Sequence, residues 1–143
     1  MYPLRLQTFA VRTASRNEMV DVTDRLRKIV TSSNITEGLL TVYVPHTTAA
    51  VTINENADPD VNSDMLAKLE ALIPKHERYY KHAEGNSDAH VKTALVGNSA
   101  TVLIEAGKLV LGQWQGIYFC EFDGPREREM MVKLVKFGPG ATD

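Results

Sequence analysis

The sequence predicts an α+β fold in a single domain that spans residues 1–143. The chain has 143 residues, of which 43% are apolar, enough to form one hydrophobic core. Several segments place apolar side chains at every second position, and two or three others place them at helical spacing. The segments follow one another without a regular strand–helix–strand alternation. This order favours a mostly antiparallel sheet.

The first half of the chain predicts four strands and two helices. Thr23 is expected to cap the first helix, with Asp24 in the first turn, where an acid is stabilised by the helix dipole. Asp58-Pro59-Asp60 is expected to open the second helix, because proline is favoured in a first turn, and Pro74 ends it. The predicted strands are residues 4–11, 19–22, 38–44 and 49–53, and the predicted helices are 23 to about 33 and 58–73.

The second half predicts one short helix and three strands. Gly97 and Asn98 are typical of a helix end. Residues 109–122 indicate one long strand, bent at Gly112 or Gly116. A tight turn at Asp123-Gly124-Pro125 follows. The remaining predictions are a loop at 75–81, a helix at 88–96, and strands at 99–105 and 126–137.

Composition and missing motifs exclude several classes of function. A net charge of −2 without a basic cluster argues against nucleic-acid and anionic-membrane partners. Cys120 is the only cysteine, so an internal disulfide is impossible and a small buried side chain is expected. The chain shows no signal-peptide pattern and no apolar run long enough for a bilayer, which predicts a cytoplasmic protein. Glycine-rich nucleotide-binding motifs are missing, so no nucleotide cofactor is expected.

The stretch from His82 to His90 is the strongest candidate for a site. Ser87 is placed to cap the following helix, which puts His90 in the first turn, where the dipole disfavours a protonated imidazole. Neutral imidazole binds metals, and Gly85 allows the chain to turn so that His82 approaches His90. A third ligand, His46 or Glu84, would complete a zinc site. The same helix start could bind a phosphate instead, or both histidines could be ordinary surface residues.

Two further clusters stand at predicted strand ends. The first is Pro45-His46-Thr47-Thr48, in which the threonines could also simply pair across a sheet. The second is Trp114-Gln115, followed by Glu121 to Arg126. Arg126 is suited to bind phosphate with its planar fork, although it could equally be a solvated rim charge. Trp114 is either a core residue or a platform for a ring, and Glu55 is either functional or a solvated strand end.

Taken together in order, these clusters resemble the YjbQ-like proteins, also called the secondary thiamine-phosphate synthase family. The resemblance covers nearly the whole chain, and its motifs are specific only in combination. The family pattern has Gly-Thr-Trp-Gln where this chain has Gln113 in place of the threonine, which affects one local contact. The matching segments are Pro45 to Ala50, Asn54 to Asp60, His82 to His90, Gly112 to Gln115 and Glu121 to Arg126.

The resemblance implies strands curled around a largely buried helix, a homotrimer, and a histidine-lined pocket with a bound metal. It also implies a weak thiamine-phosphate synthase activity, which couples a pyrimidine pyrophosphate to a thiazole phosphate. Arg126 and a divalent metal, Zn²⁺ or Mg²⁺, on His46, His82 and His90 would stabilise the leaving pyrophosphate. The expected catalytic residues are His46, Glu55, His82, His90 and Arg126, and the expected substrate-binding residues are Thr47, Thr48, Asn86, Ser87, Trp114, Gln115, Glu121 and Asp123.

Three functions compete at this point, and a small phosphorylated metabolite is the expected partner. The leading expectation is a transferase of the thiamine-phosphate synthase type. A metal-dependent hydrolase of a small phosphorylated or cyclic metabolite would use the same ligands to activate water. A non-catalytic module for an anionic metabolite would need the pocket but no chemistry.

Overall fold

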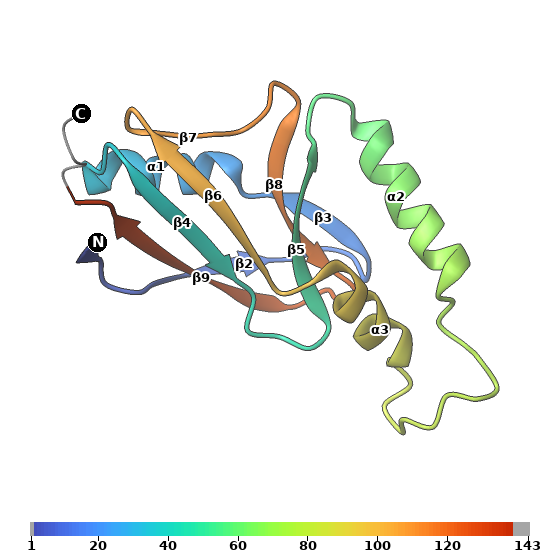
Figure 1. Cartoon of the computed structure of the whole chain (residues 1–143). Helices are drawn as coiled ribbons and strands as arrows, with labels where there is room; N and C mark the ends of the chain where they lie inside the picture. The colour runs from blue at the N-terminus through green and yellow to red at the C-terminus, as the bar shows by residue number, and fades with distance from the viewer. Residues whose placement is uncertain (1, 139–143) are drawn as a thin grey trace.

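The computed structural model describes residues 2–138, which form three helices and nine strands. Figure 1 shows two sheets with one helix, α1, between them at one end and the other two helices at the opposite side. The strands are β1 (Tyr2–Pro3), β2 (Gln7–Arg12), β3 (Glu18–Asp21), β4 (Gly38–Tyr43), β5 (Ala49–Glu55), β6 (Ser99–Glu105), β7 (Lys108–Leu109), β8 (Gln115–Glu121) and β9 (Glu127–Lys136). The helices are α1 (Thr23–Ser33), α2 (Pro59–Leu72) and α3 (Ser87–Val96).

All pairings in both sheets are antiparallel. The larger sheet has the order β1-β9-β4-β6-β7, and β2 also pairs with β9. The smaller sheet has the order β3-β8-β5. The single-domain α+β fold with antiparallel sheets is therefore confirmed.

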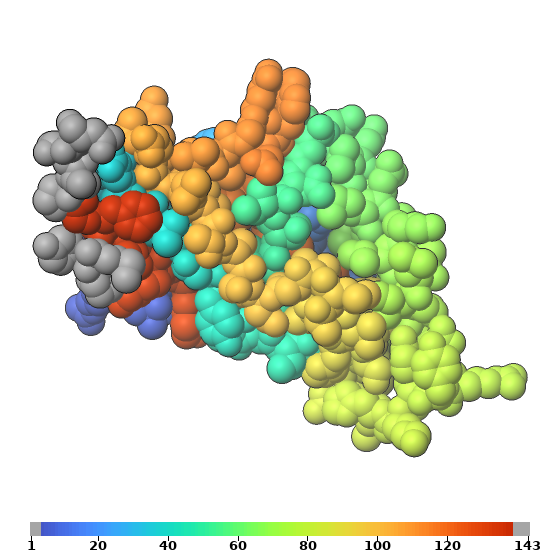
Figure 2. Space-filling model, in the orientation of Figure 1, coloured from blue at the N-terminus to red at the C-terminus, as the bar shows by residue number. Residues whose placement is uncertain are grey.

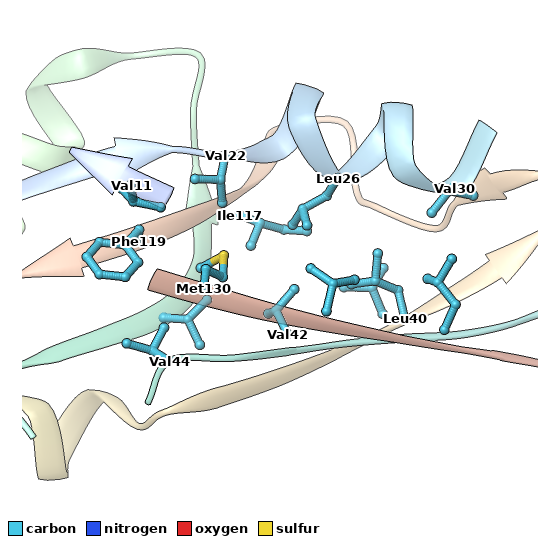
Figure 3. Packing of buried hydrophobic residues seen from close by; sticks show 14 of the residues in the cluster. Val11, Val22, Leu26, Val30, Leu40, Val42, Val44, Ile117, Phe119 and Met130 are labelled. Atoms are coloured by element: carbon cyan, nitrogen blue, oxygen red, sulfur yellow. The ribbon is translucent and has the colours of Figure 1, made fainter. Parts of the chain in front are cut away.

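The main core lies between α1, the larger sheet and β8 (Figure 3). Helix α1 buries one face through Thr23, Leu26 and Val30, which is the 3.6-residue spacing read from the sequence. Its opposite face is exposed, so the helix is buried on one side within this chain. The residues packed against it include Leu40, Val42, Ile117, Phe119, Met130 and Val132.

The two helix starts differ from each other in how their caps form. Asp58 caps α2 as predicted, and its Oδ1 accepts a hydrogen bond from the Asp60 N–H at 2.9 Å. Thr23 was predicted to cap α1, but it is the first helical residue, and its N–H donates to Oδ1 of Asp21 at 2.9 Å. The Thr23 hydroxyl instead accepts from the N–H of Ile117 at 2.8 Å, which ties α1 to β8.

The predicted long strand at 109–122 is wrong. The chain leaves the larger sheet after β7 and enters the smaller sheet at β8, with a turn between them. In this turn the side chain of Gln115 accepts from the Gly112 N–H at 2.7 Å, and the Gln115 N–H donates to the Gly112 carbonyl at 3.0 Å. The apolar residues on both sides of Gly112 to Gly116 concealed this change of sheet, because the two glycines indicated only a bend within one strand.

Two surfaces are left without cover. Figure 2 shows β4 and β6 at the surface facing the viewer, since α1 packs on the other side of the larger sheet. Helix α2 forms one flank and has no buried residue. Among the described residues no helix is long and apolar enough to cross a membrane. The cytoplasmic location stays a prediction.

Candidate functional site

A hollow of about 350 Å³ opens where three segments meet, and we call it the polar hollow. These segments are the loop between β4 and β5, the start of α3, and the turn between β8 and β9. The loop and α3 lie side by side at the lower end of the molecule in Figure 1. The lining residues are Pro45, His46, Thr47, Thr48, Glu84, Asn86, His90, Asp123, Arg126 and Arg128.

Asn98 fixes the shape of the β4–β5 loop. Its amide group donates to three loop carbonyls, those of Val44 at 3.0 Å, His46 at 2.8 Å and Ala49 at 3.2 Å. Because one side chain holds both ends of the loop, His46 keeps a defined position at the hollow. The sequence had indicated Asn98 only as part of a helix end, since spacing does not show that residues 44–49 return beside it.

His46 is held as a neutral imidazole. Its Nε2 accepts a hydrogen bond from the N–H of Glu129 at 3.0 Å, so the single ring proton lies on Nδ1. Partial burial lowers the pKa of His46, and the positive charge of Arg128 lowers it further. The ring therefore offers one N–H donor at neutral pH.

A buried ion pair forms the floor of the hollow. Arg128 is 4% exposed and Glu121 is 0% exposed, and the Arg128 Nε donates to Glu121 Oε1 at 2.8 Å. The Arg128 Nη2 also donates to the Thr48 hydroxyl at 2.8 Å, and Thr13 donates to Glu121 at 2.8 Å. Burial alone raises the pKa of Glu121, but the hydrogen bonds from Arg128 and Thr13 outweigh it and the pKa is lowered.

This pair changes the roles expected for Glu121 and Thr48. Glu121 was expected to bind substrate, but it is fully buried and does not line the hollow. Thr48 lines the hollow but its hydroxyl is used by Arg128. Sequence reasoning missed Arg128, although a signal existed: it stands at an inward position of an alternating strand, beside Met130 and Val132.

Asp123 connects the hollow to a second charge cluster. One carboxylate oxygen, Oδ2, accepts from Asn86 Nδ2 at 2.8 Å and from Arg126 Nη2 at 3.1 Å. Oδ1 lies 3.9 Å from Arg16. Asp123 thus orients both an amide and a guanidinium at the hollow, and its expected role in substrate binding stays a prediction.

The second cluster is built on α3. Asp88 is 0% exposed and accepts two hydrogen bonds from Arg16, at 2.9 Å and 3.0 Å. Lys92, one turn later, lies 3.3 Å from Asp88 and 2.6 Å from Glu70 of α2. Burial tends to raise the pKa of Asp88, but the hydrogen bonds from Arg16 and Lys92 bring it down to about 2. Neither Arg16 nor Lys92 was singled out from the sequence.

His82 and His90 do meet, as predicted. Their ring centroids are 5.3 Å apart at an interplanar angle of 82°, and the His82 Nε2 lies 3.7 Å from Glu84 Oε2. Of these two histidines, only His90 lines the polar hollow. Ser87 is the first residue of α3, with Asn86 in the cap position, so the predicted Ser87 cap is wrong.

The predicted metal ligands His46, His82 and His90 are not assembled as a metal site. Within residues 2–138 no three His, Cys, Asp or Glu side chains form a group that could hold a metal ion. A catalytic zinc site needs three protein ligands, and the Nε2 lone pair of His46 already accepts the Glu129 N–H. These side chains do not fit a Zn²⁺ or Mg²⁺ centre, so no step below uses a metal.

Glu55, Trp114 and Gln115 lie away from the hollow. In the pairing of β5 with β8, Gln115 stands opposite Glu55, whereas Glu121, at the end of β8 next to the hollow, stands opposite Ala49. Six residues of strand separate the two ends by about 20 Å. Trp114 is 57% exposed and directly precedes β8 at this far end, so it is neither a core residue nor part of this hollow.

Comparison with known proteins gives a consistent result. The family model described as "UPF0047 protein YjbQ-like" matches residues 7–137. UPF0047 protein YugU of Bacillus subtilis is 48% identical over 130 residues, which cover 91% of this chain and 98% of that protein. A UPF0047 protein of Methanocaldococcus jannaschii is 50% identical over 127 residues, covering 89% and 91%.

Solved structures agree in fold. A protein of the same family from Clostridium acetobutylicum is 49% identical with a TM-score of 0.88, covering 90% of this chain and 99% of the other. A protein from Sulfolobus solfataricus is 33% identical with a TM-score of 0.89, covering 95% and 100%, and it is described as of unknown function. The resemblance inferred from the sequence motifs is therefore confirmed.

The same comparisons correct the expected function. The four relatives named above are described as UPF0047 family proteins or as a protein of unknown function, and none of the four is described as a thiamine-phosphate synthase. The described residues also lack a group that could hold a metal ion. The expectation of a thiamine-phosphate synthase-type transferase is therefore wrong on these findings, and so is its metal-dependent hydrolase alternative.

The buried Asp88 predicts a large effect on stability. Asp88→Asn should lower the free energy of unfolding by about 3–5 kcal/mol, because it leaves Arg16 and Lys92 without their buried counter-charge. Chemical denaturation measures this. The control Asp24→Asn, whose side chain is 88% exposed in a surface pair, should change it by less than about 0.5 kcal/mol.

The pH dependence of this stability follows from the pKa of Asp88. Because folding lowers the pKa of Asp88 from 3.8 to about 2, its stabilisation is present above pH 4 and is lost as the pH falls toward 2. Asp88→Asn should flatten the decline of stability over that range. An equally steep decline in the variant would contradict the role of Asp88.

Proposed function

This chain belongs to the YjbQ-like UPF0047 family, and from the geometry of its polar hollow we propose that it binds the phosphate group of a small phosphorylated metabolite there. The observation that carries the proposal is the presence of Arg126 and Arg128 on one hollow beside the start of α3. Within the described residues neither arginine uses its Nη1 in a hydrogen bond. Two guanidinium groups and a helix N-terminus favour an oxyanion.

The other groups at the hollow support this assignment. His46 contributes a neutral ring with a proton on Nδ1. Asp123 is flanked by Arg16 and Arg126, so its negative charge is offset locally. The side chain of Glu84 is 73% exposed, where solvent screens it. A phosphate therefore meets two guanidinium groups whose counter-charges, Asp123 and Glu121, are already hydrogen-bonded to them.

We further propose that the protein is an enzyme, a prediction that neither the fold nor the relatives test. Its support is His46, because the N–H of a neutral imidazole next to a bound substrate can stabilise negative charge that develops on the substrate in the transition state. The Nδ1–H makes no hydrogen bond with any described residue, so it is available to a ligand.

Removing the Arg126 charge should weaken phosphate binding. Arg126→Ala is expected to raise the Kd for a phosphate monoester about tenfold, the loss of one charge-assisted hydrogen bond. NMR titration measures the change. The matched control is Arg27→Ala, which removes one exposed arginine on α1 and should leave the Kd unchanged. Equal weakening by both variants would reduce the effect to net charge and contradict a site at the hollow.

The enzyme proposal is tested with a panel of phosphate monoesters incubated with the protein and followed by NMR. We expect the wild type to convert at least one of them and His46→Ala to lose about 10²-fold or more of that rate, as removal of a hydrogen-bond donor to the transition state does. A panel left unchanged by the wild type, or converted equally by the variant, would contradict a catalytic His46.

We also propose that the chain assembles as a homotrimer through the uncovered face of the larger sheet. The support is apolar exposure on that face: Tyr43 of β4 is 48% exposed and Leu103 of β6 is 56% exposed. Exposed apolar clusters of this kind are typical of contact surfaces.

Sedimentation should give a mass of three chains. Leu103→Glu should lower that mass, because it places a charge on the proposed contact. Leu72→Glu, at an equally apolar and 64% exposed position on α2, should not. A monomeric wild type would contradict the homotrimer. A lower mass for Leu72→Glu alone would place the contact on α2 instead.

A further inference from the structure

Asn86 has an unusual arrangement for a residue at the start of a helix. It occupies the cap position of α3, where an asparagine side chain normally accepts a backbone N–H and so stabilises the helix. Here no side-chain cap forms. The amide nitrogen instead donates to Asp123 Oδ2 at 2.8 Å. A carboxylate only accepts, so the group facing Asp123 is the amide NH₂ and the carbonyl Oδ1 is directed elsewhere.

That carbonyl oxygen is buried and has no partner. Asn86 is 9% exposed, and no described residue donates to its Oδ1. An acceptor buried without a hydrogen bond destabilises the folded protein, because it has lost its hydrogen bonds to water. The cap that would satisfy Oδ1 is available but not made. Because Asn86 lines the polar hollow, a ligand in the hollow is the natural donor to this oxygen.

We propose that Asn86 determines specificity by requiring a proton on the bound oxyanion. Arg126, Arg128 and His46 supply donors to the unprotonated oxygens, and Asn86 Oδ1 accepts from the remaining P–O–H. The ligand class is thus a phosphate monoester in its monoanionic form. A sulfate ester of the same shape has no such proton, and its oxygen would face the Asn86 carbonyl lone pair. The inference rests on the phosphate-binding proposal and adds the protonation state and the oxyanion selected.

The charges around Asn86 come from every neighbouring segment. The positive and negative charges around Asn86 are close to balanced. The protonation state of the ligand, rather than its net charge, can therefore decide which ligand is selected. Arg16 approaches through Asp123 from the β2–β3 loop, and the groups facing the hollow itself are His46, Glu84, His90, Asp123, Arg126 and Arg128.

Methyl phosphate and methyl sulfate at pH 5.5 are a matched pair of probes. Both carry mainly one negative charge at this pH, because the second pKa of a phosphate ester is about 6, and they differ chiefly in the P–O–H. In NMR titrations the wild type should bind methyl phosphate about tenfold or more tightly than methyl sulfate, the effect of one hydrogen bond made against one repelled. Raising the pH to 8 should reduce this ratio, since the proton is lost, while methyl sulfate reports any titration of the protein itself.

Two variants test whether Asn86 causes the preference for methyl phosphate over methyl sulfate. Asn86→Ala should bring the two affinities to within about twofold. Asp123→Asn removes the fixed acceptor that orients the Asn86 amide, so it should also reduce the ratio of the two affinities. This variant provides the test if Asn86→Ala does not fold. Asn54→Ala, at an exposed asparagine on β5, is the control and should keep the ratio.

The possible outcomes distinguish a failure of the proton requirement from a failure of phosphate-group binding. Equal binding of both probes by the wild type overturns the proton requirement and leaves phosphate-group binding standing. Binding of neither probe overturns both. A preference for methyl phosphate that persists in both Asn86→Ala and Asp123→Asn overturns the role of Asn86.

Discussion

The buried pair of Arg128 and Glu121 holds together the parts that form the polar hollow. Arg128 belongs to the larger sheet and Glu121 to the smaller one, so their contact joins the two sheets where the chain turns from β8 to β9. Two further residues complete the arrangement: Thr13 donates to Glu121, and Thr48 accepts from Arg128. A buried ion pair is stable only when its remaining donors and acceptors are satisfied, and here the end of β2 and the β4–β5 loop provide most of that satisfaction.

The second charge cluster extends this constraint to the helices. Arg16 binds Asp88 of α3 and approaches Asp123 in the β8–β9 turn, while Lys92 reaches Glu70 of α2. Helix α2 has no buried residue, so polar contacts such as this one contribute to its attachment. The position of α3, and with it Asn86 and His90, depends on these charges as well as on the apolar packing of Ala89 and Val96 against the smaller sheet.

This organisation supports the proposal that the hollow binds an oxyanion rather than a metal. Each acidic group near it is already engaged by an arginine or stands in solvent, and His46 presents an N–H rather than a lone pair. Metal ligands must be unprotonated and free to converge. What remains available are the arginine Nη1 groups, one imidazole N–H and one amide carbonyl, a set that donates to an anion and accepts a single proton.

The sequence by itself determined the elements and part of the site. Alternation and helical spacing located most strands and all three helices, because burial of one face imposes a period on the chain. The motifs around His46, Asn86, His90 and Arg126 were found because clustered polar residues at element ends are visible locally. Only the tertiary structure decided that Arg128 joins these residues, that Glu121 is buried beneath them, and that Glu55 and Trp114 lie at the far end of β8. The reason is physical: local patterns show which face of a strand is buried, whereas the side chains that meet are fixed by strand register and by sheet crossings such as the turn after β7.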